Sequence, residues 1–460
     1  MGKMCEKKLL VKPRFVPRHS LSIKPYMSFH FVIGNPHDSL LLETRIITIT
    51  LWNQSLNHIK IMGLEAIFFI LEVWLLSHLV SSQWTKVLKH STFSEYRIKF
   101  KEPRLCDKTV QQYSGYFDIK DTKHLFFWFF ESRSKPQEDP IVLWLSGGPG
   151  NPSVKSLYFE LGPCFVNPGG NDTTLNPYSW NNNSSLIFLD QPINTGYSYG
   201  DDVSDSFTAA HDIYAFLQIF FQEFRQYANL NFHIAVNPLV QFKYYPDIAC
   251  DSPYGPVLDN SACNQMRKDY IQCAKLTKTC YDSKNIPDCV TAEQCFNGMT
   301  QIYRNTNRSD FDIRKSCKED SCYPELQDIA KYCNREDVKI ELGVNLSLAF
   351  QLLNANIFDK FFNSGDIIRR FDIYIPSLLE SKIRVLIYAG EFDFISNWLG
   401  CDAWTKALKW SGTEGFNNAN ISRWITTTGN YAGDVRTFKG FTFLKILNSG
   451  HLVPVDQPIA

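Results

Sequence analysis

Four apolar runs of strand length most constrain how this chain can fold. They read PIVLWL, SSLIFLD, IRVLIYAG and FTFLKILNSG, at residues 140–145, 184–190, 383–390 and 441–450. A short continuous apolar run bounded by turn residues is typical of a strand that is buried on both faces. Stretches with helical spacing lie before or between these runs, and another short strand, NFHIA, is expected at 231–235. Buried strands that alternate with helices predict an α/β fold with a mostly parallel sheet flanked by helices.

The segment 204–224 has the clearest helical pattern, because its apolar residues recur at three- and four-residue steps. Ser204 or Ser206 is expected to cap its N-terminus. The predicted apolar face consists of Phe207, Ala210, Tyr214, Leu217, Phe221 and Phe224. Farther upstream, two aromatic runs at 113–119 and 124–132 flank a short polar turn, and this pattern predicts a β-hairpin.

The charge balance argues against a nucleic-acid partner. The 460 residues include 47 basic and 47 acidic ones, whereas a nucleic-acid-binding domain needs a basic face. Hydrophobic residues make up 44% of the chain, which is enough for a large buried core. We therefore expect a globular α/β protein.

Eight cysteines fall within one short segment, and their pattern predicts disulfides rather than a zinc site. No C-x-x-C pair and no histidine lies among them, although zinc sites favour closely spaced ligand pairs. Disulfides persist in oxidising compartments, so we expect the chain to enter the secretory pathway. We expect neither a metal nor a cofactor. The eight residues are Cys250, Cys263, Cys273, Cys280, Cys289, Cys295, Cys317 and Cys322.

Residues 1–82 are interpreted as a leader that precedes the fold. Residues 1–61 are basic and lack convincing periodicity, and the apolar run AIFFILEVWLLSHLV follows at 66–80. That run is short for a membrane span and carries Glu72, so it fits the core of a signal peptide better than a stable membrane segment. Met62 is a candidate for the true start, and the alternative is a disordered basic leader.

Seven N-x-S/T sequons agree with a secretory route. The pattern is weak singly, because chance produces it often. Where such a sequon is used, the asparagine carries a bulky glycan on the protein surface. The seven asparagines are Asn53, Asn171, Asn182, Asn183, Asn307, Asn345 and Asn420.

Two titratable residues follow late strands of the predicted sheet. Asp393 comes shortly after the run at 383–390, and His451 directly follows the run at 441–450. Sites in open α/β sheets lie at the carboxyl ends of strands. Asp before His is also the order of the last two members of an α/β-hydrolase triad, in which the imidazole accepts the serine proton and the carboxylate stabilises the imidazolium. Taken singly, Asp393 also fits a turn cap, and His451 also fits an ordinary loop residue.

Many short stretches from Tyr113 to the end resemble, in order, the serine carboxypeptidase family. They include YSGYFD, WLSGGPG, FELGP, FLDQPINTGYSYG, YAGEFDFISNWLG and SGHLVPVDQP. The resemblance implies an α/β-hydrolase fold for 83–460 as one domain, with a disulfide-rich cap inserted at about 246–335. It further implies a vacuolar or extracellular peptidase that hydrolyses peptide and protein C-termini by an acyl-enzyme route.

The resemblance also assigns roles residue by residue. The aspartate and histidine described above match two triad members, and Gly148, beside Gly147, matches the donor of an oxyanion hole. Ser146 stands where the family has an asparagine that binds the substrate's C-terminal carboxylate, and Asn151 stands where it has a cysteine. Glu160 matches one member of a glutamate pair. The disulfides implied are Cys250–Cys263, Cys273–Cys295, Cys280–Cys289 and Cys317–Cys322.

The family's nucleophile is missing from its expected place. It follows the FHIA strand in the motif G-E-S-Y-A-G, but this sequence reads FHIAVNPLVQF at 232–242. Residues from Val236 onward resemble a family stretch that lies one helix and one strand later. A βαβ unit needs about 30 residues, so a central βα unit is interpreted as deleted. Ser198, in GYSYG, fits the nucleophile pattern G-x-S-x-G, but no helix follows it at once, and we predict that it is not catalytic.

Without its nucleophile the chain as written is predicted to be inactive. Three interpretations remain open: an active carboxypeptidase whose true product keeps the segment, a non-catalytic peptide-binding pseudoenzyme, and a truncated gene product without function. For the fold, we expect the strands at 231–235 and 383–390 to draw together across the gap. An unpaired ladder would cost more than the stability of a typical protein can absorb. We expect a hydrogen bond between Asp393 and His451 to remain available.

Overall fold

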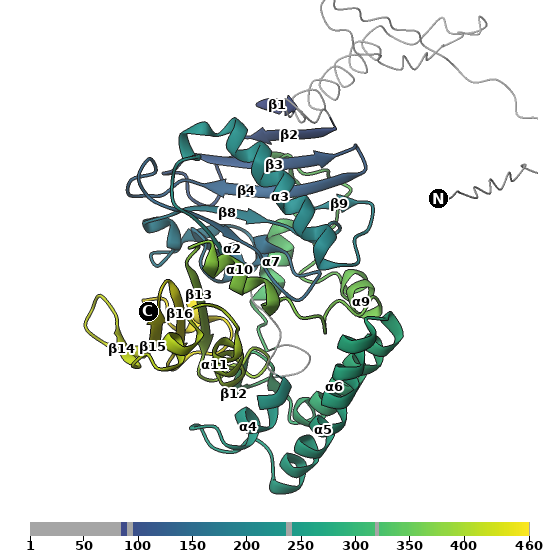
Figure 1. Cartoon of the computed structure of the whole chain (residues 1–460). Helices are drawn as coiled ribbons and strands as arrows, with labels where there is room; N and C mark the ends of the chain where they lie inside the picture. Colours follow the sequence, from purple (N-terminus) through teal and green to yellow (C-terminus); the bar gives the residue numbers. More distant parts are fainter. Residues whose placement is uncertain (1–83, 90–94, 236–241, 318–321, 460) are drawn as a thin grey trace, which may run out of the picture. The chain divides into compact units, whose positions relative to one another are not determined.

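Two β-sheets carry the fold in this computed structural model (Figure 1). The larger sheet has eight strands in the order β1-β2-β3-β4-β8-β5-β10, with β9 paired to β4, and the smaller has the order β13-β16-β15-β14. The predicted leader, 1–82, with its signal-like run and Met62, lies outside the described residues. The structure describes residues 84–89, 95–235, 242–317 and 322–459.

The elements have the following bounds. The larger sheet contains β1 (Lys86–Lys89), β2 (Tyr96–Lys101), β3 (Gln112–Ile119), β4 (Lys123–Phe130), β5 (Ile141–Trp144), β8 (Ser185–Leu189), β9 (Tyr199–Gly200) and β10 (Phe232–Ala235). The smaller sheet contains β13 (Val385–Gly390), β14 (Ser422–Ile425), β15 (Tyr431–Phe438) and β16 (Phe441–Ile446). Two short ribbons pair β6 (Cys164–Val166) with β7 (Thr173–Leu175), and β11 (Arg308–Ser309) with β12 (Asp312–Ser316). The helices are α2 (Ser153–Phe159), α3 (Ser206–Glu223), α4 (Tyr245–Cys250), α5 (Asn260–Ser283), α6 (Ile286–Arg304), α7 (Leu326–Cys333), α8 (Glu336–Leu342), α9 (Ala355–Asn363), α10 (Ile375–Glu380), α11 (Trp398–Ala407), α12 (Thr413–Asn417) and α13 (Val453–Asp456).

The sheets are mixed, whereas the sequence predicted a mostly parallel sheet. Strands β1 to β4 pair antiparallel with one another, and so do β4 and β8. Parallel pairing is confined to β8–β5, β5–β10 and β13–β16. The aromatic runs form the predicted hairpin, β3–β4, because Lys120 and Asp121 adopt left-handed conformations that close a tight turn. A tight turn permits only antiparallel pairing, since parallel strands need a longer crossover.

Strand β4 is buried on both faces and divides two apolar clusters. Phe126, Trp128 and Phe130 lie in one cluster, which includes residues of helix α2. Phe127 and Phe129, which point to the opposite face, lie in another cluster that includes residues of helix α3. Figure 1 shows α3 lying across this second face of the sheet.

Helix α3 forms as predicted, but its cap and its buried face differ from the prediction. Asp205 is the N-cap, and its carboxylate accepts a hydrogen bond from the Thr208 N–H at 2.9 Å. The predicted face is wrong in part: Phe207 and Tyr214 are 50% and 62% exposed, whereas Phe224, at the end of the helix, is buried. The helix is apolar around most of its circumference, so only contact with the sheet selects a face. The residues it buries are Ala209, Asp212, Phe216, Ile219 and Phe220.

The predicted cap is mainly helical and is held by the implied disulfides. Helices α5 and α6 pack side by side (Figure 1). All four disulfides implied by the resemblance are confirmed: Cys250–Cys263, Cys273–Cys295, Cys280–Cys289 and Cys317–Cys322. A fifth disulfide, Cys106–Cys164, joins the loop after β2 to β6 and was not predicted.

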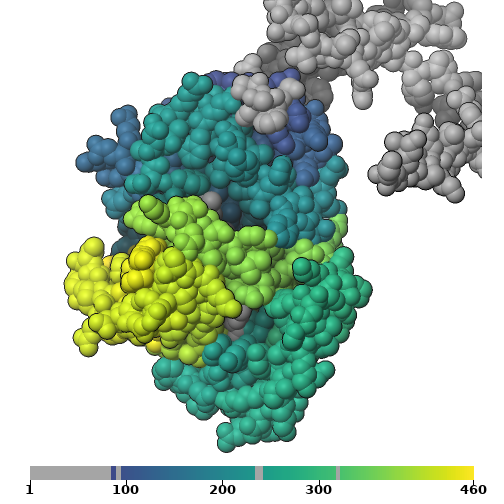
Figure 2. All heavy atoms as spheres, viewed as in Figure 1, coloured from purple at the N-terminus to yellow at the C-terminus, as the bar shows by residue number. Residues whose placement is uncertain are grey.

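The expected closure between strands β10 and β13 does not occur. Strand β10 ends the larger sheet, and β13 begins the smaller one. The smaller sheet has a hydrophobic core of its own, in which Ile387 packs with residues of α10 and α11, so its position does not depend on β10. On the face in Figure 2, the light-green segment that contains α10 borders the yellow smaller sheet. Leu386 on β13 remains 55% exposed.

The exposed edge strand generates a first prediction. Leu386→Lys should change the free energy of unfolding by less than about 0.5 kcal/mol, because the side chain already faces solvent. Ile387→Lys, the matched control one residue later and only 8% exposed, should lower it by about 3–5 kcal/mol, because it buries an unpaired charge. Urea denaturation measures both. Similar losses for the two variants would mean that another strand covers β13.

Candidate functional site

The Asp393–His451 pair lies at the ends of two neighbouring parallel strands. Strands β13 and β16 run in register, with Gly390 opposite Ile446. The loops that leave them therefore emerge side by side. His451 Nδ1 lies 2.9 Å from Asp393 Oδ2, so the structure brings these two predicted residues together.

Both partners are held by surrounding groups. Asp393 is buried, and its Oδ1 accepts a hydrogen bond from the Ser396 N–H at 3.0 Å. The His451 N–H donates to the Phe311 carbonyl at 2.7 Å. The rings of His451 and Phe311 also stack, with their centroids 5.1 Å apart. The imidazole is therefore fixed with Nδ1 toward the carboxylate.

The charge of Asp393 governs the protonation of His451. Burial disfavours the imidazolium, but the adjacent Asp393 carboxylate more than offsets this effect, with a smaller contribution from Glu160. The pKa of His451 is consequently raised above its ordinary value. The arrangement stabilises a protonated histidine, which is what a general base becomes when it accepts a proton.

A glycine-rich turn after β5 forms the second part of the site. Gly148 and Gly150 have φ values of 67° and 98°, which glycine adopts without strain. The Asn151 side-chain amide donates to the carbonyls of Gly147 and Gly148, both at 3.1 Å. The Asn151 side chain therefore closes the turn.

Ser146 is linked to Glu160 through a residue that the sequence did not single out. Ser146 Oγ lies 2.8 Å from Ser156 Oγ, and Ser156 Oγ donates to Glu160 Oε1 at 2.6 Å. Burial raises the pKa of Glu160. The sequence did indicate this link, because Ser156 and Glu160 lie four residues apart at the C-terminal end of α2 and therefore share one helix face.

Lys155 is a second residue that sequence reasoning missed. Its Nζ donates to Asn151 Oδ1 at 2.6 Å, and no carboxylate of the described residues lies within ion-pair distance. Burial lowers the pKa of Lys155. The charges of Lys155 and Glu160 both act on His451, which places the serine–glutamate chain and the imidazole in one electrostatic environment.

Ser198 makes hydrogen bonds to backbone groups of neighbouring segments. Its side chain is buried, donates to the Asp190 carbonyl at 2.6 Å, and accepts from the Phe126 N–H at 2.7 Å. One hydrogen bond ties the loop before β9 to β4, and the other ties it to the residue that follows β8. The hydroxyl therefore holds the backbone together.

Within the described ranges, no three His, Cys, Asp or Glu residues are grouped so that they could hold a metal ion. The described helices also include none with the length and apolar character needed to cross a bilayer.

Comparison with known proteins gives consistent matches along the chain. The family model of serine carboxypeptidases matches residues 103–238 and 235–460. Carboxypeptidase Y of Candida albicans is 42% identical, with 79% of this chain and 74% of that protein covered. Carboxypeptidase Y of Saccharomyces cerevisiae is 38% identical, with 82% and 79% covered. The crystal structure of Kex1, a prohormone-processing carboxypeptidase from Saccharomyces cerevisiae, matches with a TM-score of 0.63 at 20% identity. It covers 78% of this chain and 92% of that chain, and it shows a shared α/β-hydrolase fold.

The histidine pair generates a second prediction. In an NMR titration, His451 should have a pKa above about 6.5, and Asp393→Asn should lower it, because burial is then opposed only by the smaller effect of Glu160. A pKa raised by folding stabilises the protein below the ordinary histidine pKa, and this contribution is lost as the pH rises through the raised value. His451→Gln identifies the resonance. The same pKa in wild type and Asp393→Asn would contradict the assignment.

Proposed function

Because the chain belongs to the serine carboxypeptidase family, we propose that its site descends from one that releases C-terminal residues from peptides through an acyl-enzyme. We further propose that the chain as its sequence stands lacks the nucleophile for this reaction. One observation carries the proposal: the Asp393–His451 pair is formed, but the sequence directly after β10 reads VNPLVQF and offers no serine where the family has its nucleophile.

The surviving groups have clear tasks in the ancestral reaction. With Nδ1 engaged by Asp393, the His451 Nε2 is left to accept a proton from a nucleophile. Backbone N–H groups at Gly147 and Gly148 are suited to stabilise an oxyanion. Ser146 is suited to hydrogen-bond the substrate's C-terminal carboxylate.

Two sequence observations support a missing segment. The family match is split into two pieces that meet at 235–238, directly after β10, where a nucleophile would stand in the family. The alignment with the Candida albicans relative extends over 402 positions although it uses only 79% of this 460-residue chain. The relative therefore has residues in the aligned region that this chain lacks.

Without a nucleophile, the chain would lose most of the rate enhancement of the ancestral reaction. Removing the serine from a serine protease costs on the order of 10⁶-fold in kcat. The second oxyanion donor, which follows the serine in the family, is absent with it. The chain in this form is therefore proposed to be inactive toward peptides.

A peptide-binding pseudoenzyme is the second candidate. It is favoured by the hydrogen bonds that link Ser146 through Ser156 to Glu160. These groups could bind a peptide end without a nucleophile. The disulfides support passage through an oxidising compartment, and we propose a vacuolar or extracellular location. A truncated product without function is the third interpretation, and absence of secreted protein would support it.

A labelling experiment tests the proposed inactivity. An organophosphonate probe should label no serine of the chain as written, and peptide hydrolysis should stay at background, because the imidazole has no hydroxyl to activate. Inserting the corresponding segment of the Candida albicans relative between Ala235 and Val236 should restore both labelling and turnover. Sequencing cDNA across this junction would determine whether the natural transcript carries such a segment.

Two variants of the restored chimera serve as controls. His451→Gln should abolish turnover, while Ser198→Ala should leave it unchanged. Labelling of the original chain at Ser198, or turnover by the original chain that His451→Gln removes, would contradict the proposal.

A further inference from the structure

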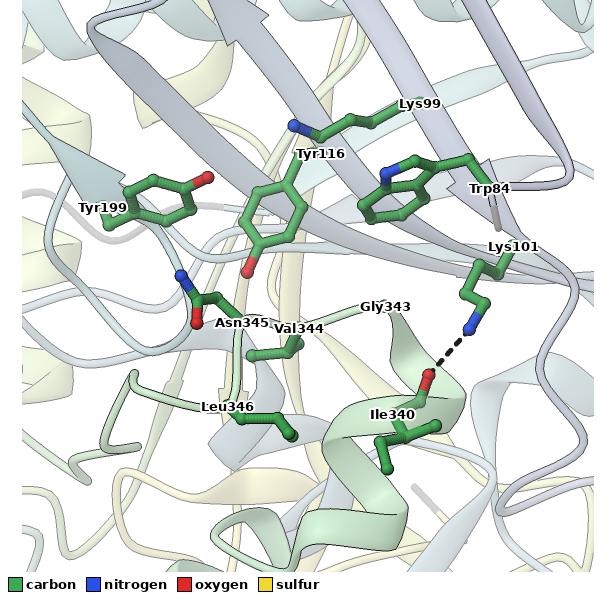
Figure 3. A pocket seen from close by; sticks show the side chains of 10 residues that line it. All are labelled: Trp84, Lys99, Lys101, Tyr116, Tyr199, Ile340, Gly343, Val344, Asn345 and Leu346. Carbon is green, nitrogen blue, oxygen red and sulfur yellow. Dashed lines mark hydrogen bonds between the residues drawn. The ribbon is translucent and has the colours of Figure 1, made fainter. Parts of the chain in front are cut away.

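An aromatic pocket lies apart from the candidate site and shares no residue with it (Figure 3). It has a volume of about 250 Å³ and opens to solvent. Its walls come from β2, β3, β9 and the loop that follows helix α8. The lining residues are Trp84, Lys99, Lys101, Tyr116, Tyr199, Ile340, Gly343, Val344, Asn345 and Leu346.

Three rings give the pocket its shape. Trp84 meets Tyr116 edge to face, with centroids 6.1 Å apart, and Tyr116 meets Tyr199 in the same manner at 5.4 Å. Trp84 packs closely against Gly343, where an added Cβ would come within 2.6 Å of the indole ring. The rings are therefore held in place before any ligand binds.

The two lysines in the wall already have partners. Lys99 Nζ lies 3.0 Å from an Asp118 carboxylate oxygen, and Lys101 Nζ donates to the Ile340 carbonyl at 2.8 Å. An anionic ligand would have to compete with these contacts. A neutral ligand with apolar C–H faces and hydroxyl groups, such as a sugar, suits the wall better.

Asn345, at the rim, heads the sequon Asn-Leu-Ser. Its Oδ1 accepts hydrogen bonds from both the N–H and the Oγ of Ser347, each at 3.0 Å. No described residue accepts a hydrogen bond from Nδ2. Figure 3 shows the amide nitrogen directed toward the tyrosine side of the pocket.

The other described sequon asparagines do not line the pocket; they are Asn171, Asn182, Asn183, Asn307 and Asn420. Asn182 uses its side chain within the fold, since its Nδ2 donates to the Pro177 carbonyl and its Oδ1 accepts from Arg133. Asn420 is exposed and does not line the aromatic pocket. It therefore offers a natural comparison with Asn345.

We propose that Asn345 carries an N-linked glycan whose first sugars pack into the pocket against the half-buried Trp84 and Tyr199, beside the buried Tyr116. The donor is an oligosaccharide on a lipid diphosphate. A bond forms between Nδ2 and the anomeric carbon, the bond from that carbon to the diphosphate oxygen breaks with its electron pair, and Nδ2 loses one proton. The inference rests on the proposed passage through the secretory pathway.

The glycan has a defined physical effect. It covers the parts of Trp84 and Tyr199 that would otherwise face water. Its attachment next to the pocket keeps the local sugar concentration high. The glycan on Asn345 is therefore less accessible in the folded protein than one on Asn420, because a deglycosylating enzyme must wait for it to leave the pocket.

Glycopeptide mass spectrometry and native deglycosylation test the two parts. The full chain, secreted from a yeast host behind a secretion signal, should carry glycan at Asn345, and Ser347→Ala should remove it. Under native conditions, an endoglycosidase should cleave at Asn345 about tenfold more slowly than at Asn420. Trp84→Ala and Tyr199→Ala should each abolish the difference, and Tyr431→Ala, an exposed tyrosine outside the pocket, should preserve it.

Each alternative outcome identifies the step that fails. If no sequon is modified, the chain does not pass through the secretory pathway and the inference falls with it. If Asn420 is modified and Asn345 is not, the modification itself is wrong. If both glycans are cleaved at equal rates, or if the pocket variants change nothing, the glycan does not occupy the pocket.

Discussion

Apolar packing between helix α2 and the segment after β16 joins the two sheets into one site. Leu452, next to His451, is buried in the same cluster as Val154, Leu157 and Phe159 of α2. The larger sheet supplies the glycine-rich turn and the serine–glutamate chain, and the smaller sheet supplies the imidazole. The interaction between these groups therefore depends on a hydrophobic contact rather than on a continuous ladder of strands.

Strands β10 and β13 belong to different sheets, and this separation determines which groups of the site are held together. Asp393 and His451 both follow strands of one parallel pair, so the register of β13 and β16 brings them together without any contribution from β10. A nucleophile would have to come from the end of β10, in the other sheet. The proposed loss of a βα unit at that point would remove the serine and leave the acid–base pair in place, and the Asp393–His451 hydrogen bond is indeed formed.

The sequence predicted the strands, the hairpin and the disulfide-held insertion, because each depends on local apolar pattern or on resemblance to known relatives. It failed where a choice depended on tertiary contact. The buried face of α3 was wrong in part since the helix offers apolar residues on several faces, and Phe216 rather than Tyr214 meets the sheet. Closure of β10 onto β13 was wrong because the smaller sheet's own core was not visible in the pattern.

The part of the site that matches sequence motifs was predictable, and the part that depends on tertiary contact was not. Asp393, His451, Ser146 and Glu160 could be placed by motif, whereas Lys155 matches no family motif and becomes prominent only through its burial and its contact with Asn151. The links within the site, such as Ser156 between a serine and a glutamate, required the geometry of α2.

Amide hydrogen exchange along β10 and β13 tests the central claim most directly. If no strand lies between them, the N–H groups that point away from β5 and β16 should exchange rapidly in both strands, while those bonded to β5 and β16 stay protected. Alternating fast and slow amides along Val385–Gly390 is the predicted result. Uniform protection of both strands would contradict the account, because it would require a pairing partner that the described chain does not contain.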